Sequence, residues 1–307
     1  MSSAPTVFVC AATGSQGLNL ARQLREASWT VHATVRNPTS PASLTLAALG
    51  VKLTTGDWDN TAALEASMAG CTHLFLNTII PFANPSHERV QAARILSIAK
   101  AAGVRHVVYS SALSVDRLDE VAHLDPESIP GQSVYSKQAI ETAVKAAGFE
   151  SWTILRGPSF MENFLLPKVA MFGALRDTGV WRAAYTPETV MPLVDTDDIA
   201  RFAVAAFRDP KRFHGKGVAI AGDALTPPQI LEKLSKATGR EMSFVQMSDE
   251  EVKAQGAVNP FIRAQLVVAQ LIDFIDLEEP KSWGVQLTTF DEFLVKNKEL
   301  VRETYEL

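Results

Sequence analysis

A turn with two glycines follows the first predicted strand, residues 6–11, and is suited to hold a diphosphate. Glycines in such a turn let the backbone approach a dinucleotide, and the N-terminus of the following helix presents free N–H groups to an anion. Ala11 stands where the motif has its first glycine, which suits the motif only if Ala11 does not need a positive φ. A plain loop is the alternative. The expected cofactor contacts are Ala12, Thr13, Gly14, Ser15, Gln16 and Gly17.

Arg36 directly follows the second predicted strand, residues 30–35, about 20 residues beyond the glycines. A carboxylate at this place would bind the ribose 2′-hydroxyl of NAD, whereas a guanidinium offers two parallel donors to the 2′-phosphate of NADP. The arginine therefore favours NADP(H). The alternative is that Arg36 is an ordinary solvated loop residue.

Polar residues also follow the third and fourth predicted strands, residues 51–55 and 72–77. We expect Asp57 to accept a hydrogen bond from the adenine amine and Trp58 to flank the ring, although Asp57 to Asp59 could simply cap a turn and a helix. The residues at which the fourth strand ends are expected on the nicotinamide side of the sheet, where they bind the ribose or merely finish the strand. They are Asn77, Thr78 and Ile79.

A predicted helix carries Lys137 toward the same crevice, where a lysine can bridge the nicotinamide ribose hydroxyls. Glu141 lies four residues further on, so a surface pair worth about 0.3 kcal/mol is the alternative role of Lys137. Hydride transfer also needs a proton source, which Lys137 would supply through a water or a nearby hydroxyl. The expected catalytic residues are Lys137, Tyr135 and Ser111.

Short β-branched runs alternate with amphipathic segments in the N-terminal half, which predicts an α/β fold with a doubly wound parallel sheet. Two further strands are expected at residues 106–110 and 152–155, and a last one at 218–221. We therefore assign residues 1–157 to a cofactor-binding domain, to which 191–222 return. In such sheets the ligand lies at the carboxyl ends of the strands.

The pattern loosens after Pro158, and residues 158–190 with 223–307 are expected to form a smaller, mostly helical substrate lobe. Helices are predicted at 160–175, 194–207, 261–275 and 290–305, and an irregular or strand-like stretch at 180–191. Apolar residues of this lobe and of one loop are candidates for the substrate pocket, with a core position as the alternative for each. They are Phe82, Phe160, Met161, Phe164 and Trp181.

Composition narrows the possible partners and the compartment. The 307 residues carry 29 Lys and Arg against 34 Asp and Glu, and this net charge of −5 disfavours direct binding of nucleic acid. Neither a signal peptide nor a membrane-spanning run is apparent, so we expect a cytoplasmic protein. Cys10 and Cys71 fall at opposite ends of two parallel strands and are expected to be free thiols. The six histidines are scattered, and no metal site is predicted.

Several of these residues, taken together, resemble the NmrA-like family of atypical short-chain dehydrogenase/reductase proteins. The similarity rests on Ala-Thr-Gly-Ser-Gln-Gly at 12–17, Arg36-Asn37-Pro38, Gly56-Asp57, Ser136-Lys137 with Glu141, Arg156 to Phe164, Val194-Asp195 before Asp198, and residues 287–293. This resemblance implies a Rossmann fold, a preference for NADP, and cofactor contacts at Gln16, Arg36, Asp57, Lys137, Pro158, Ser159, Phe160 and Met161.

The chain departs from the wider superfamily at the expected proton donor. Ser133, not tyrosine, stands four residues before Lys137, and Ala112 stands near the usual serine or threonine. We therefore consider two functions. The first is an NADPH-dependent oxidoreductase that transfers hydride to a carbonyl, imine or activated C=C of a small, fairly apolar molecule. The second is a non-catalytic NADP(H) sensor that acts through a regulatory protein partner, and a homodimer is compatible with either.

Overall fold

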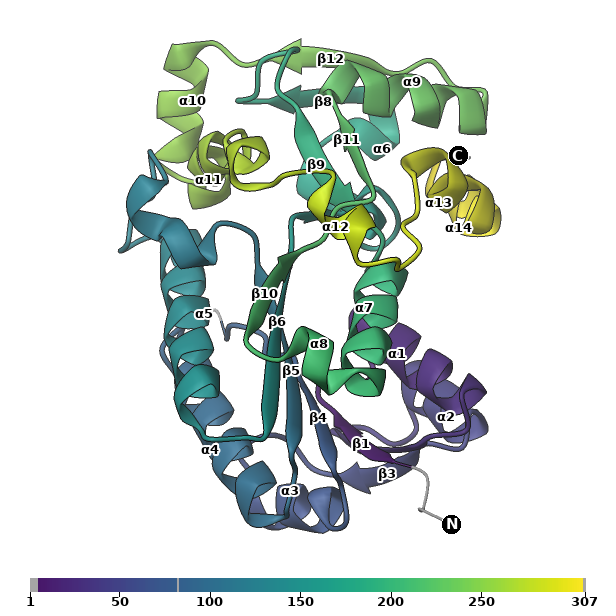
Figure 1. The fold of residues 1–307 in the computed structure, drawn as a ribbon. Helices are drawn as coiled ribbons and strands as arrows, with labels where there is room; N and C mark the ends of the chain where they lie inside the picture. Colours follow the sequence, from purple (N-terminus) through teal and green to yellow (C-terminus); the bar gives the residue numbers. More distant parts are fainter. Residues whose placement is uncertain (1–4, 82, 306–307) are drawn as a thin grey trace. The chain divides into compact units, whose positions relative to one another are not determined.

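The structure is a computed structural model that describes residues 5–81 and 83–305. Its largest sheet has seven strands in the order β10-β6-β5-β4-β1-β2-β3 (Figure 1). Strand β1 pairs in parallel with both β2 and β4, so the chain leaves the centre of the sheet in one direction and later returns to fill the other. This confirms the predicted doubly wound sheet. The strands are β1 (Thr6–Val9), β2 (Thr30–Val35), β3 (Lys52–Thr55), β4 (His73–Leu76), β5 (His106–Ala112), β6 (Ser151–Gly157) and β10 (Lys216–Ala219).

Helices cover both faces of this sheet, because successive strand residues point to opposite sides. Tyr109 of β5 belongs to the core under α3, α4 and α5, whereas the next residue, Ser110, faces α1 and donates to Gln16. The helices of the first set are α3 (Thr61–Met68), α4 (His87–Ala101) and α5 (Ile129–Ala146). On the other side of the strands lie α1 (Ser15–Glu26), α2 (Pro41–Ala48) and α7 (Thr196–Arg208) (Figure 1).

The chain divides into two compact units. Unit 1 comprises Met1–Val115, Gln132–Arg156 and Ile199–Val218, and unit 2 comprises Asp116–Gly131, Gly157–Asp198 and Ala219–Leu307. These limits differ from the sequence-based ones at residues 116–131, 157, 191–198 and 219–222. Within unit 2, the segment 116–131 is joined to the C-terminal part of the chain by Gln270, whose side-chain amide accepts from Ala122 N and donates to Ala122 O, both at 3.0 Å.

Unit 2 contains two small sheets as well as helices. The strands β11, β9 and β7 form one sheet, and β12 pairs in parallel with β8 in the other. A cluster of buried apolar residues around Trp181 and Phe290 forms its core. The strands are β7 (Ser159–Phe160), β8 (Val180–Ala183), β9 (Met191–Val194), β11 (Asp223–Leu225) and β12 (Ser243–Gln246); the helices are α6 (Leu175–Thr178), α9 (Pro227–Thr238), α10 (Asp249–Gly256), α11 (Pro260–Val268), α12 (Glu279–Ser282), α13 (Phe290–Lys296) and α14 (Lys298–Tyr305).

The long helices predicted for unit 2 are shorter or broken. Residues 160–175 form two 3₁₀ turns, Met161–Phe164 and Lys168–Phe172, because Pro167 interrupts the chain and Gly173 turns it with a φ of 62°. The helix predicted at 261–275 ends as α11, and a 3₁₀ turn, Leu271–Phe274, follows it. The segment 290–305 forms α13 and α14, which are separated at Asn297.

Cys10 and Cys71 are both buried free thiols, as predicted. They follow β1 and precede β4, which are neighbours in the sheet. Burial raises the pKa of each thiol to about 12, so both stay protonated and unreactive near neutral pH.

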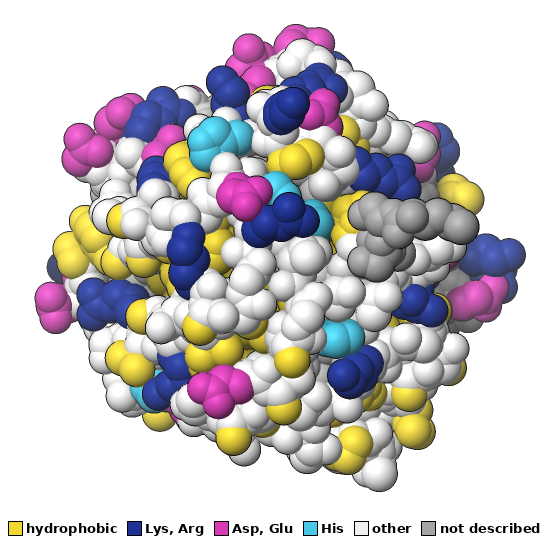
Figure 2. Space-filling model, turned by 60° about the horizontal axis from the view of Figure 1, so that its bottom comes forward, with side chains coloured by type: hydrophobic (Ala, Val, Ile, Leu, Met, Phe, Trp, Pro, Cys, Tyr) yellow, Lys and Arg dark blue, Asp and Glu magenta, His cyan; other side chains and the backbone are white. Residues whose placement is uncertain are grey.

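Charged side chains of both signs are interspersed over the face drawn in Figure 2, rather than gathered by sign. Within the described part of the chain, no helix combines the length and the apolar character needed to cross a membrane.

Candidate functional site

The glycine turn connects β1 to α1 as predicted, but Ala11 adopts a positive φ. Its φ is 48°, in the left-handed region that costs an alanine about 1–2 kcal/mol. The expectation that the motif tolerates Ala11 only without a positive φ is therefore wrong: the turn takes the glycine-like conformation and Ala11 bears the strain. Gly14 N donates to Ala11 O at 2.9 Å and closes the turn.

Gly17 allows α1 to pass close to this turn. A Cβ on Gly17 would lie 2.4 Å from Ala11 O and 2.7 Å from Ala12 Cα, distances that no side chain can occupy. Gly14 is the N-cap of α1 in an extended conformation, and no side chain of the described residues caps the helix. Thr13 and Gly14 are exposed, so the N-terminus of α1 is accessible to an anion.

Gln16 has a partner that the sequence analysis did not identify. Its Oε1 accepts a hydrogen bond of 2.6 Å from Ser110 Oγ, which joins the first turn of α1 to the carboxyl-terminal part of β5. Gln16 therefore links two of the strand ends at which a ligand is expected.

Arg36 is exposed at the end of β2, and no carboxylate among residues 5–81 and 83–305 forms an ion pair with it. The loop behind it is ordered by Asn37, whose Oδ1 accepts from Thr39 N at 3.0 Å and from Thr39 Oγ1 at 2.8 Å. The guanidinium thus projects from a shaped turn and is available for an anionic ligand.

Asp57 has the capping role that we considered as its alternative. Its Oδ1 accepts from Asp59 N and Asn60 N, both at 3.0 Å, and Asn60 in turn caps α3. Trp58 is half-buried and packs against the core under α3 and α4. Asp59, which the sequence analysis did not select, accepts from His87, Gln91 and Arg94 of α4, and these bonds, that of His87 above all, lower its pKa to about 2.

Thr78, Glu88 and Lys137 form a polar group after β4, in which Thr78 and Glu88 are buried and Lys137 is partly exposed. Thr78 Oγ1 donates to Glu88 Oε1 at 2.9 Å, and Lys137 Nζ lies 3.3 Å from the same oxygen. Glu88 is fully buried, and its Oε2 has no partner among the described residues. The residues on either side of Thr78 are less buried than Thr78 itself: Asn77 is half-buried, and Ile79 is 62% exposed.

Glu141 pairs with Arg156, not with Lys137, so the alternative role predicted for Lys137 is wrong. Arg156 Nε and Nη2 donate to the two carboxylate oxygens at 2.9 and 2.7 Å. Ser111 Oγ donates to Glu141 Oε1 at 2.8 Å, which directs the hydroxyl hydrogen of this predicted catalytic residue to a carboxylate. Both Glu141 and Arg156 are buried.

Two tyrosines lie near these groups in different settings. Tyr109 is fully buried, and its hydroxyl has no hydrogen-bond partner within the described residues. Desolvation, with the charges of Glu88 and Glu141, holds its pKa well above the ordinary value. Tyr135 is 38% exposed on α5, and two residues along a helix separate it from Lys137 by about 200° around the axis. The structure thus brings Lys137, Thr78 and Glu88 together and leaves Tyr135 outside this group.

The remaining predicted residues belong to unit 2. Pro158 is buried, Ser159 and Phe160 form the short strand β7, and Met161 is fully buried at the start of a 3₁₀ turn. Phe164 and Trp181 are also core residues, so Met161, Phe164 and Trp181 do not line an open pocket, contrary to the first expectation. Phe82 lies outside the described residues.

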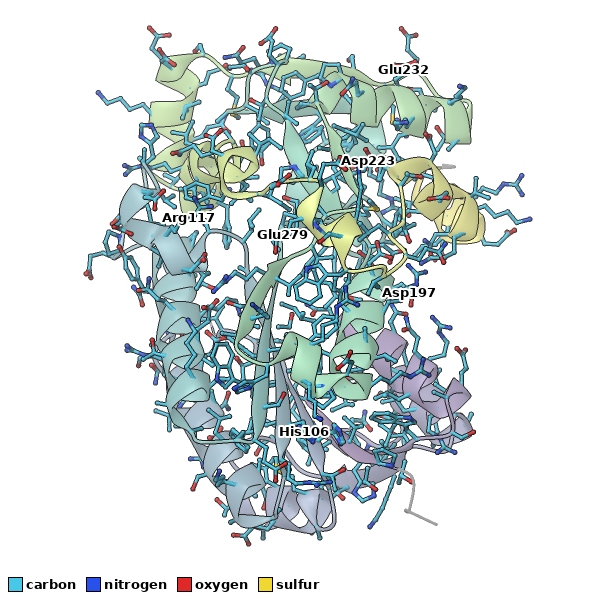
Figure 3. All side chains as sticks on the ribbon, viewed as in Figure 1. His106, Arg117, Asp197, Asp223, Glu232 and Glu279 are labelled. Atoms are coloured by element: carbon cyan, nitrogen blue, oxygen red, sulfur yellow. The ribbon has the colours of Figure 1, made fainter. Side chains whose placement is uncertain are left out.

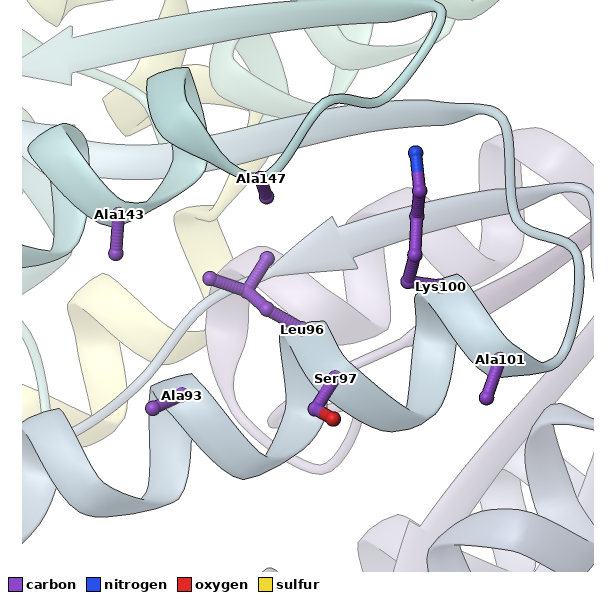
Figure 4. A pocket seen from close by; sticks show the side chains of 7 residues that line it. All are labelled: Ala93, Leu96, Ser97, Lys100, Ala101, Ala143 and Ala147. Atoms are coloured by element: carbon purple, nitrogen blue, oxygen red, sulfur yellow. The ribbon is translucent and has the colours of Figure 1, made fainter.

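A groove of about 540 Å³ lies between α4 and α5 (Figure 4). Its side chains are small or apolar apart from Ser97 and Lys100, so it offers no chemistry of the kind expected at the strand ends. The lining residues are Ala93, Leu96, Ser97, Lys100, Ala101, Ala143 and Ala147.

The chain is similar to known proteins over most of its length. A (4-alkanoyl-5-oxo-2,5-dihydrofuran-3-yl)methyl phosphate reductase from Streptomyces griseus is 32% identical over 242 residues, which cover 78% of this chain and 77% of the relative. The solved structure of an NADPH-dependent quinone oxidoreductase from Escherichia coli with NADPH matches with a TM-score of 0.72 at 24% identity, covering 94% of this chain and 99% of the other. NmrA, a negative transcriptional regulator in complex with NADP, matches with a TM-score of 0.72 at 19% identity, covering 99% and 96%.

Both solved structures confirm the fold. The model of the NmrA-like family matches residues 3–294, nearly the entire sequence, including the glycine turn, Arg36, Lys137 and the segment after β6. The chain therefore belongs to the NmrA-like family.

Proposed function

We propose that the protein is an NADPH-dependent reductase that transfers hydride to a carbonyl, imine or activated C=C of a small, fairly apolar molecule. The observation that carries the proposal is that unit 1 combines two features: an α1 N-terminus that no described side chain caps, and the exposed Arg36 at the end of β2. Names of relatives support it: the Streptomyces griseus protein is a reductase, and the Escherichia coli enzyme is NADPH-dependent.

The residues of unit 1 fit a phosphorylated dinucleotide. The accessible amides at the start of α1 would hold the diphosphate, and the positive end of the helix dipole favours this charge. Arg36 would donate two hydrogen bonds to the 2′-phosphate. Lys137 would donate to the ribose hydroxyls next to the nicotinamide, since its side chain is 19% exposed and can reach a ligand. The bound cofactor would supply the hydride.

The proton is expected to come by way of Lys137. Ser111 donates its hydroxyl hydrogen to Glu141, and Tyr135 lies around the helix from Lys137, so neither is as well placed as the ammonium. Lys137 would pass a proton to the substrate directly or through a water, and solvent would restore it.

Replacement of Arg36 by alanine tests the cofactor site. We expect Arg36→Ala to weaken NADPH binding by about 10- to 100-fold, less than the full value of two charge-assisted hydrogen bonds because Arg36 is exposed to solvent, and to change NADH binding by less than about threefold. Isothermal titration of both nucleotides measures this. Arg208→Ala, which removes an exposed arginine at the end of α7, is the matched control and should alter neither affinity. Equal losses for NADPH and NADH in Arg36→Ala would contradict the assignment.

A second candidate function is a non-catalytic NADP(H) sensor. It is favoured by Ser133, which stands where the wider superfamily has its tyrosine, and by the likeness of the fold to a transcriptional regulator solved with NADP. Oxidation of NADPH in the presence of a panel of carbonyl compounds separates the two functions. Turnover that is lost in Lys137→Ala supports the reductase, whereas tight NADPH binding without turnover supports the sensor.

A further inference from the structure

Glu88 is a fully buried carboxylate whose contact with a cation is made by Lys137. It lies in the first turn of α4 and is fully buried. One oxygen accepts from Thr78 and contacts Lys137, and the other has no partner among the described residues. Since burial of a carboxylate costs several kcal/mol unless a cation compensates it, the charge depends on Lys137.

Lys137, on α5, contacts Glu88, on α4, although another acid stands much closer in the sequence. Glu141 lies one turn further along α5, the usual position for a helical partner of Lys137. Arg156 and Ser111 occupy the oxygens of Glu141, and Glu88, on α4, is the acid that Lys137 meets. The lysine side chain is therefore directed to Glu88 and not to the acid one turn along its own helix.

The geometry leaves part of the ammonium group available. An ammonium has three N–H donors in rotatable positions, and one directed at Glu88 leaves two for another acceptor. The lysine side chain is 19% exposed, whereas that of Glu88 is inaccessible, so a ligand can meet the lysine but not the glutamate.

We propose that Glu88 is a positioning residue for Lys137: it holds the ammonium group so that the remaining N–H groups bind the ribose hydroxyls of NADPH. This inference rests on the proposed function, because it assumes that Lys137 meets the cofactor. Glu88 itself does not touch the ligand. Thr78 supports it by donating to the same oxygen that faces the lysine.

A double-mutant cycle on NADPH affinity tests the proposal. The variants are Glu88→Gln, which keeps the shape and an acceptor for Thr78, Lys137→Met, and the two together. We expect Glu88→Gln and Lys137→Met each to weaken NADPH binding by about tenfold, and the double variant to bind no more weakly than Lys137→Met alone. The dissociation constants are measured by isothermal titration, and thermal unfolding of each free protein reports stability separately.

Two further variants keep the test decisive. Lys145→Met removes another lysine of α5 that contacts a buried acid, Glu141, at 3.4 Å, and should leave NADPH affinity unchanged. Glu88→Asp keeps the charge but moves the carboxylate away from Lys137 by the length of one methylene, and it should weaken NADPH binding by about threefold. This variant replaces Glu88→Gln in the test if Glu88→Gln does not fold.

The outcomes separate this inference from the proposed function. Wild-type protein that binds no NADPH would overturn both. Wild-type protein that binds NADPH, with Glu88→Gln or Glu88→Asp of equal affinity, would overturn the positioning role alone. Losses that multiply in the double variant would also overturn it, because the glutamate would then act independently of Lys137.

Discussion

Glu141 in unit 1 and Glu162 in unit 2 are both withdrawn from solvent, yet they are satisfied in different ways. The carboxylate of Glu141 receives two hydrogen bonds from the Arg156 guanidinium and one from Ser111. Glu162 receives bonds from the amide and the hydroxyl of Thr196, at the start of α7, and its buried Oε2 has no partner among the described residues.

No cation among the described residues forms an ion pair with Glu162. Lys296 donates to Asp195 and Asp197, the second of which is labelled near the start of α7 in Figure 3. Burial, with the charge of Asp195, raises the pKa of Glu162 to about 7 against the opposing effect of Thr196. A buried acid paired with a guanidinium thus has a compensated charge, whereas one held by neutral donors can gain or lose a proton near neutral pH.

Removal of the guanidinium should have the largest effect. Arg156→Met leaves Glu141 buried, with the 42% exposed Lys145 as its remaining ion-pair partner among the described residues, and we expect the free energy of unfolding to fall by about 3–5 kcal/mol. Urea unfolding at pH 7 measures it. The double variant Arg156→Met, Glu141→Leu should recover most of the loss, because no charge is then buried. A single variant as stable as the wild type would show that the ion pair is not what satisfies Glu141.

The next effect depends on pH. The raised pKa of Glu162 means that the folded protein binds its proton more tightly than the unfolded chain, whose pKa is about 4.5. The protonated side chain of Glu162 therefore stabilises the folded protein in full below pH 4.5. This stabilisation is lost as the pH rises through about 7, by about 3 kcal/mol in total. Glu162→Gln lacks this proton, so the stability of the wild type relative to the variant should decline between pH 5 and pH 8.

Urea unfolding of both proteins across this range isolates Glu162. Other groups titrate in both proteins alike, such as His73, whose pKa burial lowers to about 3, and their contributions cancel in the difference. A difference that stays constant from pH 5 to pH 8 would show that Glu162 does not titrate there.

The smallest of the three effects concerns the space around Arg156. A Cβ on Gly217 of β10 would lie 2.3 Å from Arg156 Nη1, so Gly217→Ala must push the guanidinium away from Glu141. We expect a loss of about 1–2 kcal/mol despite the better strand propensity of alanine. In the Arg156→Met background the same substitution should cost nothing, and an equal cost in both backgrounds, measured by urea unfolding, would refute the steric explanation.

The motif between Arg156 and Phe164 predicted the family correctly but not the local structure. These residues supported the family resemblance, and the family model confirms it. The motif nevertheless divides between the units: Arg156 belongs to unit 1, whereas Glu162 belongs to unit 2. The helix expected after it was wrong because apolar periodicity over 160–175 reflects burial in a core built from short turns.

Local chemistry in the sequence was sufficient for the doubly wound sheet, the glycine turn before α1 and the exposed arginine after β2. Strand alternation, helix caps and turn glycines act over a few neighbouring residues, so they can be read along the chain. Tertiary structure decided which acid meets which base: Lys137 meets Glu88, 49 positions away, and Glu141 meets Arg156. Such pairs form where the packing of α4, α5 and the sheet excludes water, and no local pattern specifies that environment.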